Sequence, residues 1–359
     1  MAGKFKWGKF SECDINDTFF DSLKEDYPEF EDWFRKKAAE DKEAFVFSDE
    51  AGLGAFVCLK PDDNEPIELM DRTLPAAKRF KISTLKLADR FQGLRLGEGA
   101  VGIALWHWQK DKSKEIYVTV FEKHKPLISL LELFGFKCIG TLKRTGECAF
   151  FRSREQIDYS DPFKSFPFIN PNFTVASLIP IKHDWHDTLF PFSELMRTNQ
   201  EVEEMAAANG ITKVYIGTPS SLPNHAVGEP VIVYRISDKE PKTYHSVATS
   251  YSVITDIKVI KSGWKYKMSQ EDFLRYIGNK SVFTGDELVR IYNTKSPNIV
   301  MFEIAYNGFF GKGHNVTHNE LKNSGLWFDM HPYHFQYSKE QFVKILQMGD
   351  VDVQNVIVN

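Results

Sequence analysis

The chain has 359 residues, of which 42% are apolar and 26% charged, and its formal net charge is −4. This length favours two domains, and the composition is typical of a soluble globular protein and excludes a disordered one. The acidic balance excludes the global basic excess of a strong duplex-DNA binder, so a nucleic-acid contact would need a local basic patch. No stretch reaches the ~18 apolar residues of a spanning helix and no signal peptide is evident, so we expect no membrane contact and a cytoplasmic location.

Cysteine and histidine spacing argues against a metal site. The four cysteines include no CxxC pair, a pattern that favours reduced thiols. Three histidine pairs have a spacing of three or four residues: His183 and His186, His314 and His318, and His331 and His334. A zinc site needs three or four converging ligands, and none of these pairs comes with a cysteine. We therefore expect no metal.

Helix and strand patterns alternate through the first half of the chain. We expect helices over 17–39 (interrupted at Pro28), 97–110 and 126–134, and strands over 44–48, 53–60, 68–72, 79–87, 115–120, 136–142 and 147–152. This order predicts a mixed sheet with helices on both faces, an α/β fold.

The most informative segment joins the predicted strand 79–87 to the next helix and reads Gln92-Gly93-Leu94-Arg95-Leu96-Gly97-Glu98. Such a turn directs successive backbone N–H groups at one point, where the positive end of the helix dipole also lies. Glycines let a phosphate approach the backbone, and two arginines, Arg90 and Arg95, are placed to add charged contacts. A dinucleotide-binding motif fits less well because the GxGxxG spacing is missing. The turn therefore predicts a diphosphate site.

This turn resembles the Q/R-x-x-G-x-G/A signature of the GNAT N-acetyltransferase family, with Arg95 in place of the first motif glycine. A strand at 116–120 and the sequence Leu131-Glu132-Leu133-Phe134-Gly135-Phe136 follow in the family's order, so the resemblance extends over about residues 16–153. It implies acetyl-CoA as the cofactor. The implied cofactor-binding residues are Leu85, Leu87, Gln92, Gly93, Leu94, Arg95, Leu96, Gly97 and Glu98.

The same resemblance implies that a neutral amine attacks the acetyl thioester, which a backbone N–H between the two central strands polarises. Leu131 stands where the family usually has a tyrosine that reprotonates the thiolate, and His124 stands where it usually has asparagine. Our candidates for the base that takes the amine's proton are Glu122, His124 and Glu68. The alternative interpretation makes Glu122 a solvated loop charge and His124 a helix cap.

A proline-rich stretch over 156–175 predicts a linker between a domain of residues 1–155 and one of residues 176–359. In the second half we expect strands over 175–181, 213–216, 231–236, 245–260 and 298–305, and helices over 193–208, 269–277 and 339–348. These elements predict an α+β domain with a small, partly open β-barrel.

The order of the segments 178–191, 208–216 and 228–235 resembles the PUA-like group, which includes PUA, ASCH and EVE domains, over about residues 176–348. The resemblance implies recognition of RNA or of a modified base, by stacking on aromatic side chains and contacts from polar ones. Candidate residues are Trp185, Tyr215, Tyr234, Arg235, Tyr251, Trp264 and Trp327. We expect Arg235 to be the most exposed of these, whereas an aromatic residue in a strand is usually core.

A local basic patch lies at 258–267, where four lysines alternate with aromatic residues. Its residues Trp264, Lys265, Tyr266 and Lys267 are candidates for contacts with phosphates and bases. The alternative is a solvated hairpin end.

Together these features predict an acetyl-CoA-dependent N-acetyltransferase whose acceptor is selected by a PUA-like RNA-binding module. One acceptor of this kind is the amine of an aminoacyl-tRNA, on analogy with toxin enzymes of the family; a free small amine or a protein amine stays open, as does a homodimer. Because Leu131 replaces the usual tyrosine, a second hypothesis is a non-catalytic acyl-CoA-binding sensor of nucleic acid. A third is a reader of modified bases in which the first half is a scaffold.

Overall fold

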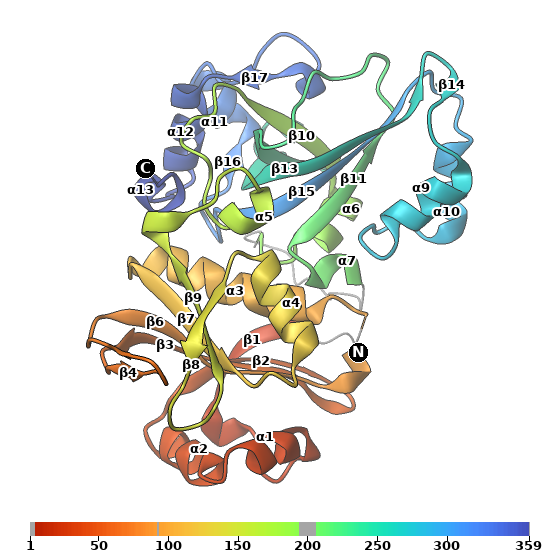
Figure 1. Ribbon diagram of the computed structural model, residues 1–359. Coiled ribbons are helices and arrows are strands. Elements are labelled where there is room, and N and C mark those ends of the chain that lie inside the picture. Colours follow the sequence, from red (N-terminus) through yellow and green to blue (C-terminus); the bar gives the residue numbers. More distant parts are fainter. Residues whose placement is uncertain (1–3, 92, 194–205, 359) are drawn as a thin grey trace. The chain divides into compact units, whose positions relative to one another are not determined.

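The computed structural model describes residues 4–91, 93–193 and 206–358. They form two compact units, the first ending at Gln156 and the second starting at Ile157. Figure 1 shows that each unit is built around its own β-sheet. Both sheets mix parallel and antiparallel pairs, so the chain has a mixed α/β fold.

The sheet of the first unit has seven strands. Their spatial order is β1 (Lys4–Lys9), β2 (Glu43–Asp49), β3 (Gly52–Asp63), β6 (Arg79–Leu87), β7 (Glu115–Val120), β9 (Cys148–Ser153) and β8 (Lys137–Thr141). Two short strands, β4 (Ile67–Glu68) and β5 (Thr73–Leu74), pair with each other in a separate two-stranded sheet. β6 and β7 are parallel neighbours in the middle of the sheet, and the other neighbours are antiparallel.

Helices cover both faces of this sheet. They are α1 (Asp21–Asp26), α2 (Phe30–Ala39), α3 (Leu96–Asp111) and α4 (Lys125–Leu133), with 3-10 turns η1 (Phe10–Glu12), η2 (Thr18–Phe20), η3 (Asp89–Phe91) and η4 (Arg154–Gln156). Val46 of β2 belongs to the same buried cluster as Phe34 of α2. Its neighbour Phe45 contacts Trp7, which in turn contacts His107 of α3 at 5.2 Å between ring centres. Because alternate residues of a strand face opposite sides, α2 and α3 lie on opposite faces of the sheet.

The second unit has a sheet of eight strands. Six follow one path, β11 (Thr212–Gly217), β15 (Ile299–Phe309), β13 (Val247–Ser262), β12 (Pro230–Ile236), β10 (Ala176–Lys182) and β17 (Gln336–Tyr337), while β14 (Lys265–Tyr266) and β16 (Val316–Thr317) pair with β13. β10 and β12 are parallel. Within the ranges described, no pairing closes this path into a ring, and the predicted partly open barrel is not confirmed.

Two buried clusters hold the helices that follow Ser269 in the second unit. The helices of the whole unit are α5 (Pro162–Ser165), α6 (His183–Leu189), α7 (Ala206–Asn209), α8 (Lys242–His245), α9 (Gln270–Ile277), α10 (Gly285–Tyr292), α11 (His318–Asn323), α12 (Lys339–Met348) and α13 (Val353–Val356), with the 3-10 turn η5 (Pro332–His334). One cluster packs α11 and α12 on β10, β12 and β13. The other packs α9 and α10 on β11 and on parts of β13 and β15.

Most expected elements of the first unit have bounds within two residues of those found, but β1 was not predicted, although Lys4-Phe5-Lys6-Trp7 alternates polar and apolar residues. Most of the expected helix 193–208 lies outside the described residues. The segment 156–175, expected as a linker, includes the helix α5 and the fully buried Ile169, which joins the core of the second unit.

Candidate functional site

The two central strands of the first unit separate at their carboxyl ends. β6 and β7 pair only from Phe80 opposite Ile116 to Ile82 opposite Val118. The next residue of β6, Ser83, is an extra residue in its pairing with β3, and such a bulge bends a strand. Beyond it, Thr84–Leu87 pair with β3 and Thr119–Val120 with β9, but not with each other. We call these two segments the splayed strand ends.

The turn that follows β6 includes two residues with positive φ, Gly93 and Arg95. Gly93 has φ +79°, and a side chain there would meet open space, so its backbone is accessible. Arg95 has φ +58°, and α3 begins directly after it. The amides of Leu96 and Gly97 are in the first turn of α3, where no carbonyl inside the helix can accept from them. Gln92, the remaining residue of the predicted signature, lies outside the described residues.

The turn is anchored on β2 and β3. The ring of Phe91 lies over Gly54, where even a Cβ atom would come within 2.4 Å of it, and meets Phe47 edge-on at 5.1 Å. Nη2 of Arg90 donates to Asp49 at 2.8 Å and to the carbonyl of Gly52 at 2.9 Å. The position of the turn is therefore fixed by a residue that must be glycine and by a buried ring.

The start of α3 lies against the end of β6. A Cβ on Gly97 would be 3.0 Å from Leu87 and 3.4 Å from Leu130 of α4. The predicted residue Arg95 holds Glu98 through two hydrogen bonds of 2.9 and 2.8 Å. The amides at the start of α3 therefore lie beside one of the splayed strand ends, while the Arg95 charge is balanced by Glu98.

Helix α1 contacts the splayed end of β6 and the residues that follow β7. At β6, Nζ of Lys86 donates to Oγ of Ser22 at 2.5 Å. Beyond β7, Asp26 pairs with Lys123, and its Oδ2 lies 3.5 Å from Nε2 of His124. The residue after α1, Tyr27, packs on Phe121 with 5.5 Å between ring centres. Ionisable groups from α1 therefore gather near the end of β7.

The three candidate bases have different surroundings. The side chain of Glu122 is 84% exposed, and a hydrogen bond from Lys125 holds the pKa of its carboxyl below the usual range. Glu68 is exposed on β4, outside the seven-stranded sheet. His124 is the N-cap residue of α4. Unlike the other two candidates, it is paired with a carboxylate, that of Asp26.

A buried pair near the same place was not anticipated. Tyr27 donates to Glu147 at 2.5 Å, and Glu147 is 3% exposed. Burial and the bond to Glu147 raise the pKa of Tyr27 well above its ordinary value. The two residues are 120 positions apart, and no local pattern in the sequence could have paired them. Leu131, which replaces the family's tyrosine, is fully buried.

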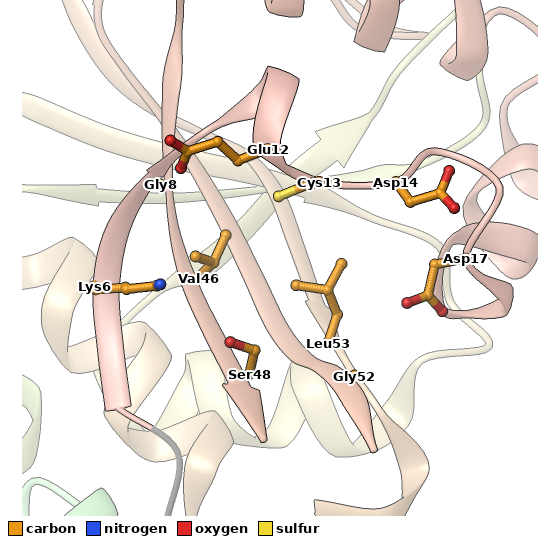
Figure 2. A pocket seen from close by; sticks show the side chains of 10 residues that line it. All are labelled: Lys6, Gly8, Glu12, Cys13, Asp14, Asp17, Val46, Ser48, Gly52 and Leu53. Carbon is orange, nitrogen blue, oxygen red and sulfur yellow. The ribbon is translucent and has the colours of Figure 1, made fainter. Parts of the chain in front are cut away.

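A cavity of about 250 Å³ lies on the β1 side of the sheet. Figure 2 shows Lys6 on one of its sides and the carboxylates of Asp14 and Asp17 on the other. Both carboxylates accept from nearby backbone amides, those of Asn16 and Phe19. None of the predicted cofactor residues lines this cavity.

In the second unit, the expectation that Arg235 is exposed is wrong. Its side chain is 10% exposed and donates to Asp187 at 2.7 and 2.8 Å. Burial acts to raise the pKa of Asp187, but hydrogen bonds from Arg235 and His186 outweigh it and hold the pKa far below the usual range. His186 also contacts Thr249 at 2.8 Å, so Arg235 belongs to a buried polar network. Its guanidinium is not presented to a nucleic acid.

The other candidate aromatic residues differ in burial, and two of them, Trp185 and Trp327, are half-buried. Tyr215, Tyr234 and Tyr251 are buried, as the alternative interpretation expected of strand residues. Trp264, by contrast, is 62% exposed, and Tyr266 is 45% exposed.

These two exposed rings belong to the hairpin between β13 and β14. Ser262 pairs with Lys265, which leaves Gly263 and Trp264 as a two-residue turn with φ of +52° and +70°. Positive φ at both positions is the pattern of a type I′ turn, which favours Asn-Gly or Gly-Gly. A bulky residue in this conformation costs about 1–2 kcal/mol. The residue in this unfavourable conformation is the exposed Trp264.

Among the residues described, no three His, Cys, Asp or Glu side chains are grouped so as to hold a metal ion. Across the same ranges, every helix is too short or too polar to span a membrane.

No protein-family model matches the chain, and no curated protein matches it. Solved structures match parts of it. The ASCH protein of Zymomonas mobilis is 10% identical, over 47% of this chain and 92% of its own, with a TM-score of 0.31. The PaiA N-acetyltransferase of Thermoplasma acidophilum, in complex with coenzyme A, is 15% identical, over 43% of this chain and 99% of its own, with a TM-score of 0.30. Each match covers less than half of the chain, so the chemistry of the site rests on the chain's own residues.

Proposed function

We propose that the first unit is an acetyl-CoA-dependent N-acetyltransferase. The observation that carries the proposal is the adjacency of two features. The first is the first turn of α3, where the amides of Leu96 and Gly97 have no acceptor inside the helix, and the second is the splayed strand end of β6, whose Leu87 lies against Gly97. The first feature suits a diphosphate, and the second suits an extended, amide-bearing chain. Coenzyme A has both parts in this order.

The residues present fit such a cofactor. Gly93 leaves open space at the turn, so a phosphate can approach its backbone. On the side facing β7, the backbone of Leu85–Leu87 has no strand partner, so its amides and carbonyls can bind the pantetheine arm as a neighbouring strand would. When bound, the cofactor supplies an acetyl thioester.

We assign proton transfer to groups near the end of β7. We assign the base that accepts the amine's proton to His124, which Asp26 positions at 3.5 Å. Leu131 replaces the tyrosine with which the family reprotonates the thiolate. Near the same place, Tyr27, which donates to Glu147, offers a hydroxyl group for this step. Glu122 has no part in this assignment, because its carboxylate is exposed to solvent and pairs with Lys125.

The acceptor part of the proposal is an amine carried by RNA, such as that of an aminoacyl-tRNA. It is supported by the PUA-like order of segments and by the exposed aromatic and basic hairpin at Trp264–Lys267. Arg235 no longer contributes, since its guanidinium is buried against Asp187.

The test combines binding and turnover on the full chain. Calorimetry with acetyl-CoA should show binding, and release of the coenzyme A thiol should rise with aminoacylated tRNA more than with deacylated tRNA or with polyamines. Absence of acetyl-CoA binding would overturn the proposal. Release with polyamines alone would keep the acetyltransferase and replace the acceptor.

A second candidate function is favoured by one observation, the full burial of Leu131 where the family has its proton donor. The protein would then bind acyl-CoA without turnover and act as a sensor of nucleic acid. Binding of acetyl-CoA without thiol release for any of these amines would favour this candidate over the first.

A further inference from the structure

The tip of the β13–β14 hairpin presents a tryptophan in a fixed position. The amide of Trp264 donates to the carbonyl of Pro297 at 2.9 Å, and the amide of Gly263 donates to Oδ1 of Asn298 at 3.1 Å. The amide group of Asn298 is held in turn by the carbonyls of Pro219 and Ser220, at 3.2 and 2.8 Å. Because these bonds fix the turn, the 62%-exposed ring of Trp264 loses little freedom when it binds a ligand.

A second ring and a buried cation support this tip. Tyr266 stacks on Tyr292 with 4.6 Å between ring centres, and its hydroxyl donates to the carbonyl of Tyr292 at 3.1 Å. Nζ of Lys261 lies 5.5 Å from the ring centre of Trp264 and 4.9 Å from that of Tyr266, and it donates to Thr294 at 3.0 Å. Lys261 is itself 5% exposed, so it stabilises the rings and does not serve as a surface charge.

The surface charge around the rings is positive. Lys265, Lys267 and Lys295 are all exposed, and residues 257–268 include no Asp or Glu. Across the described part of the chain, no carboxylate lies within ion-pair distance of these three lysines. An exposed planar ring beside uncompensated ammonium groups suits a ligand that has both flat aromatic faces and negative charge.

We propose that this hairpin binds single-stranded nucleic acid, with an unpaired base stacked on Trp264 and phosphates at Lys265 and Lys267. The inference deepens the RNA-binding part of the proposed function. It requires unpaired bases, because the bases of a duplex are stacked inside the helix and cannot lie on an exposed ring. Stacking on the face of a ring does not read base edges, so binding tolerates many sequences.

The experiment uses the full-length protein without acetyl-CoA and a labelled 12-nucleotide oligo(U), followed by fluorescence anisotropy. Trp264→Gly is the informative variant because glycine suits the positive φ and relieves the strained backbone. It should melt no lower than the wild type and bind the oligonucleotide about tenfold more weakly. Lys265→Gln should weaken binding and lower the slope of log affinity against log salt by about 0.7.

Tyr244→Ala is the matched control. Tyr244 is an aromatic residue of the same unit that is 59% exposed on α8, and its removal should leave the affinity unchanged. Wild-type affinity in Trp264→Gly, or equal competition by a 12-base-pair duplex, would overturn the proposal. Binding to phosphatidylserine vesicles that depends on Trp264, without oligonucleotide binding, would also overturn it and assign the hairpin to membranes.

The nucleic-acid inference and the acetyltransferase proposal can fail independently of each other. Oligonucleotide binding that depends on Trp264 supports this inference even if acetyl-CoA fails to bind. Acetyl-CoA turnover together with unchanged oligonucleotide affinity in Trp264→Gly overturns this inference alone.

Discussion

Nε2 of His124 lies 3.5 Å from Oδ2 of Asp26. His124 begins α4, just beyond the end of β7, and Asp26 ends α1, whose Ser22 also contacts the end of β6. The pair therefore joins the region beyond β7 to the helix that also contacts the splayed end of β6. A carboxylate that orients an imidazole is a common arrangement for a base that accepts a proton.

The first prediction concerns this pair. Asp26→Asn should lower kcat for acetyl transfer by about 100-fold and leave the KM for acetyl-CoA unchanged, because the pair accepts a proton and does not bind the cofactor. The measurement is a steady-state thiol-release assay over a range of pH. Glu122→Gln is the control and should keep wild-type activity, since that side chain is 84% exposed. Equal losses in both variants would contradict the assignment.

The second prediction concerns the anchor of the turn. Phe91→Ala should destabilise the first unit by roughly 3 kcal/mol and also weaken acetyl-CoA binding, because the ring fixes the turn over Gly54. Phe34→Ala removes another buried ring, from α2, and should cost similar stability without changing the affinity. Denaturant unfolding and calorimetry measure the two effects. Equal affinities in the two variants would show that the turn does not depend on Phe91.

The third prediction concerns pH. Burial, with a smaller contribution from Lys110, lowers the pKa of His107 from 6.5 to about 4. As the pH falls below 6.5, the unfolded chain therefore binds a proton that the folded chain does not. Stability from this group is fully present above pH 6.5 and is lost as the pH falls toward 4, by about 2–3 kcal/mol.

His107→Gln should accordingly reduce the fall in melting temperature of the first unit between pH 7 and pH 5. The exposed His245 supplies the comparison, and its replacement by Gln should leave that fall unchanged. The same pH dependence in wild type and His107→Gln would show that this histidine is not responsible.

The fourth prediction concerns the corrected residue Arg235. Arg235→Gln leaves the carboxylate of Asp187 with one charged partner fewer in a largely buried network, so it should cost about 3 kcal/mol of stability. The folded fraction should bind oligo(U) with wild-type affinity, because the guanidinium does not reach the surface. A stable variant with weakened binding would restore Arg235 to the nucleic-acid site.

The sequence predicted the parts of the fold that local patterns control. Alternating apolar residues marked β6 and β7 at their observed bounds, and the glycine-containing turn before α3 indicated where an anion site would lie. The separation of the two strands was beyond such patterns. It depends on the bulge at Ser83 and on which neighbour each strand pairs with, and both are tertiary properties.

The sequence misplaced or missed residues whose surroundings depend on segments far away in the chain. Strand alternation predicted that Arg235 and its neighbour Tyr234 face opposite sides of the sheet. It gave no information on whether Asp187, 48 residues away, would cover Arg235. The bond between Tyr27 and Glu147 likewise joins distant segments. For Trp264, the basic and aromatic composition was visible, whereas its positive φ and its anchoring by Pro297 were not.

The most direct test of the account compares two glycines of the first unit. Gly93 and Gly146 have nearly the same φ, +79° and +76°, and a side chain on either meets open space, so valine strains both positions alike. Only Gly93 lies in the turn before α3. Calorimetry with acetyl-CoA should show at least tenfold weaker binding for Gly93→Val and unchanged binding for Gly146→Val. Equal affinity of Gly93→Val and the wild type would contradict the account.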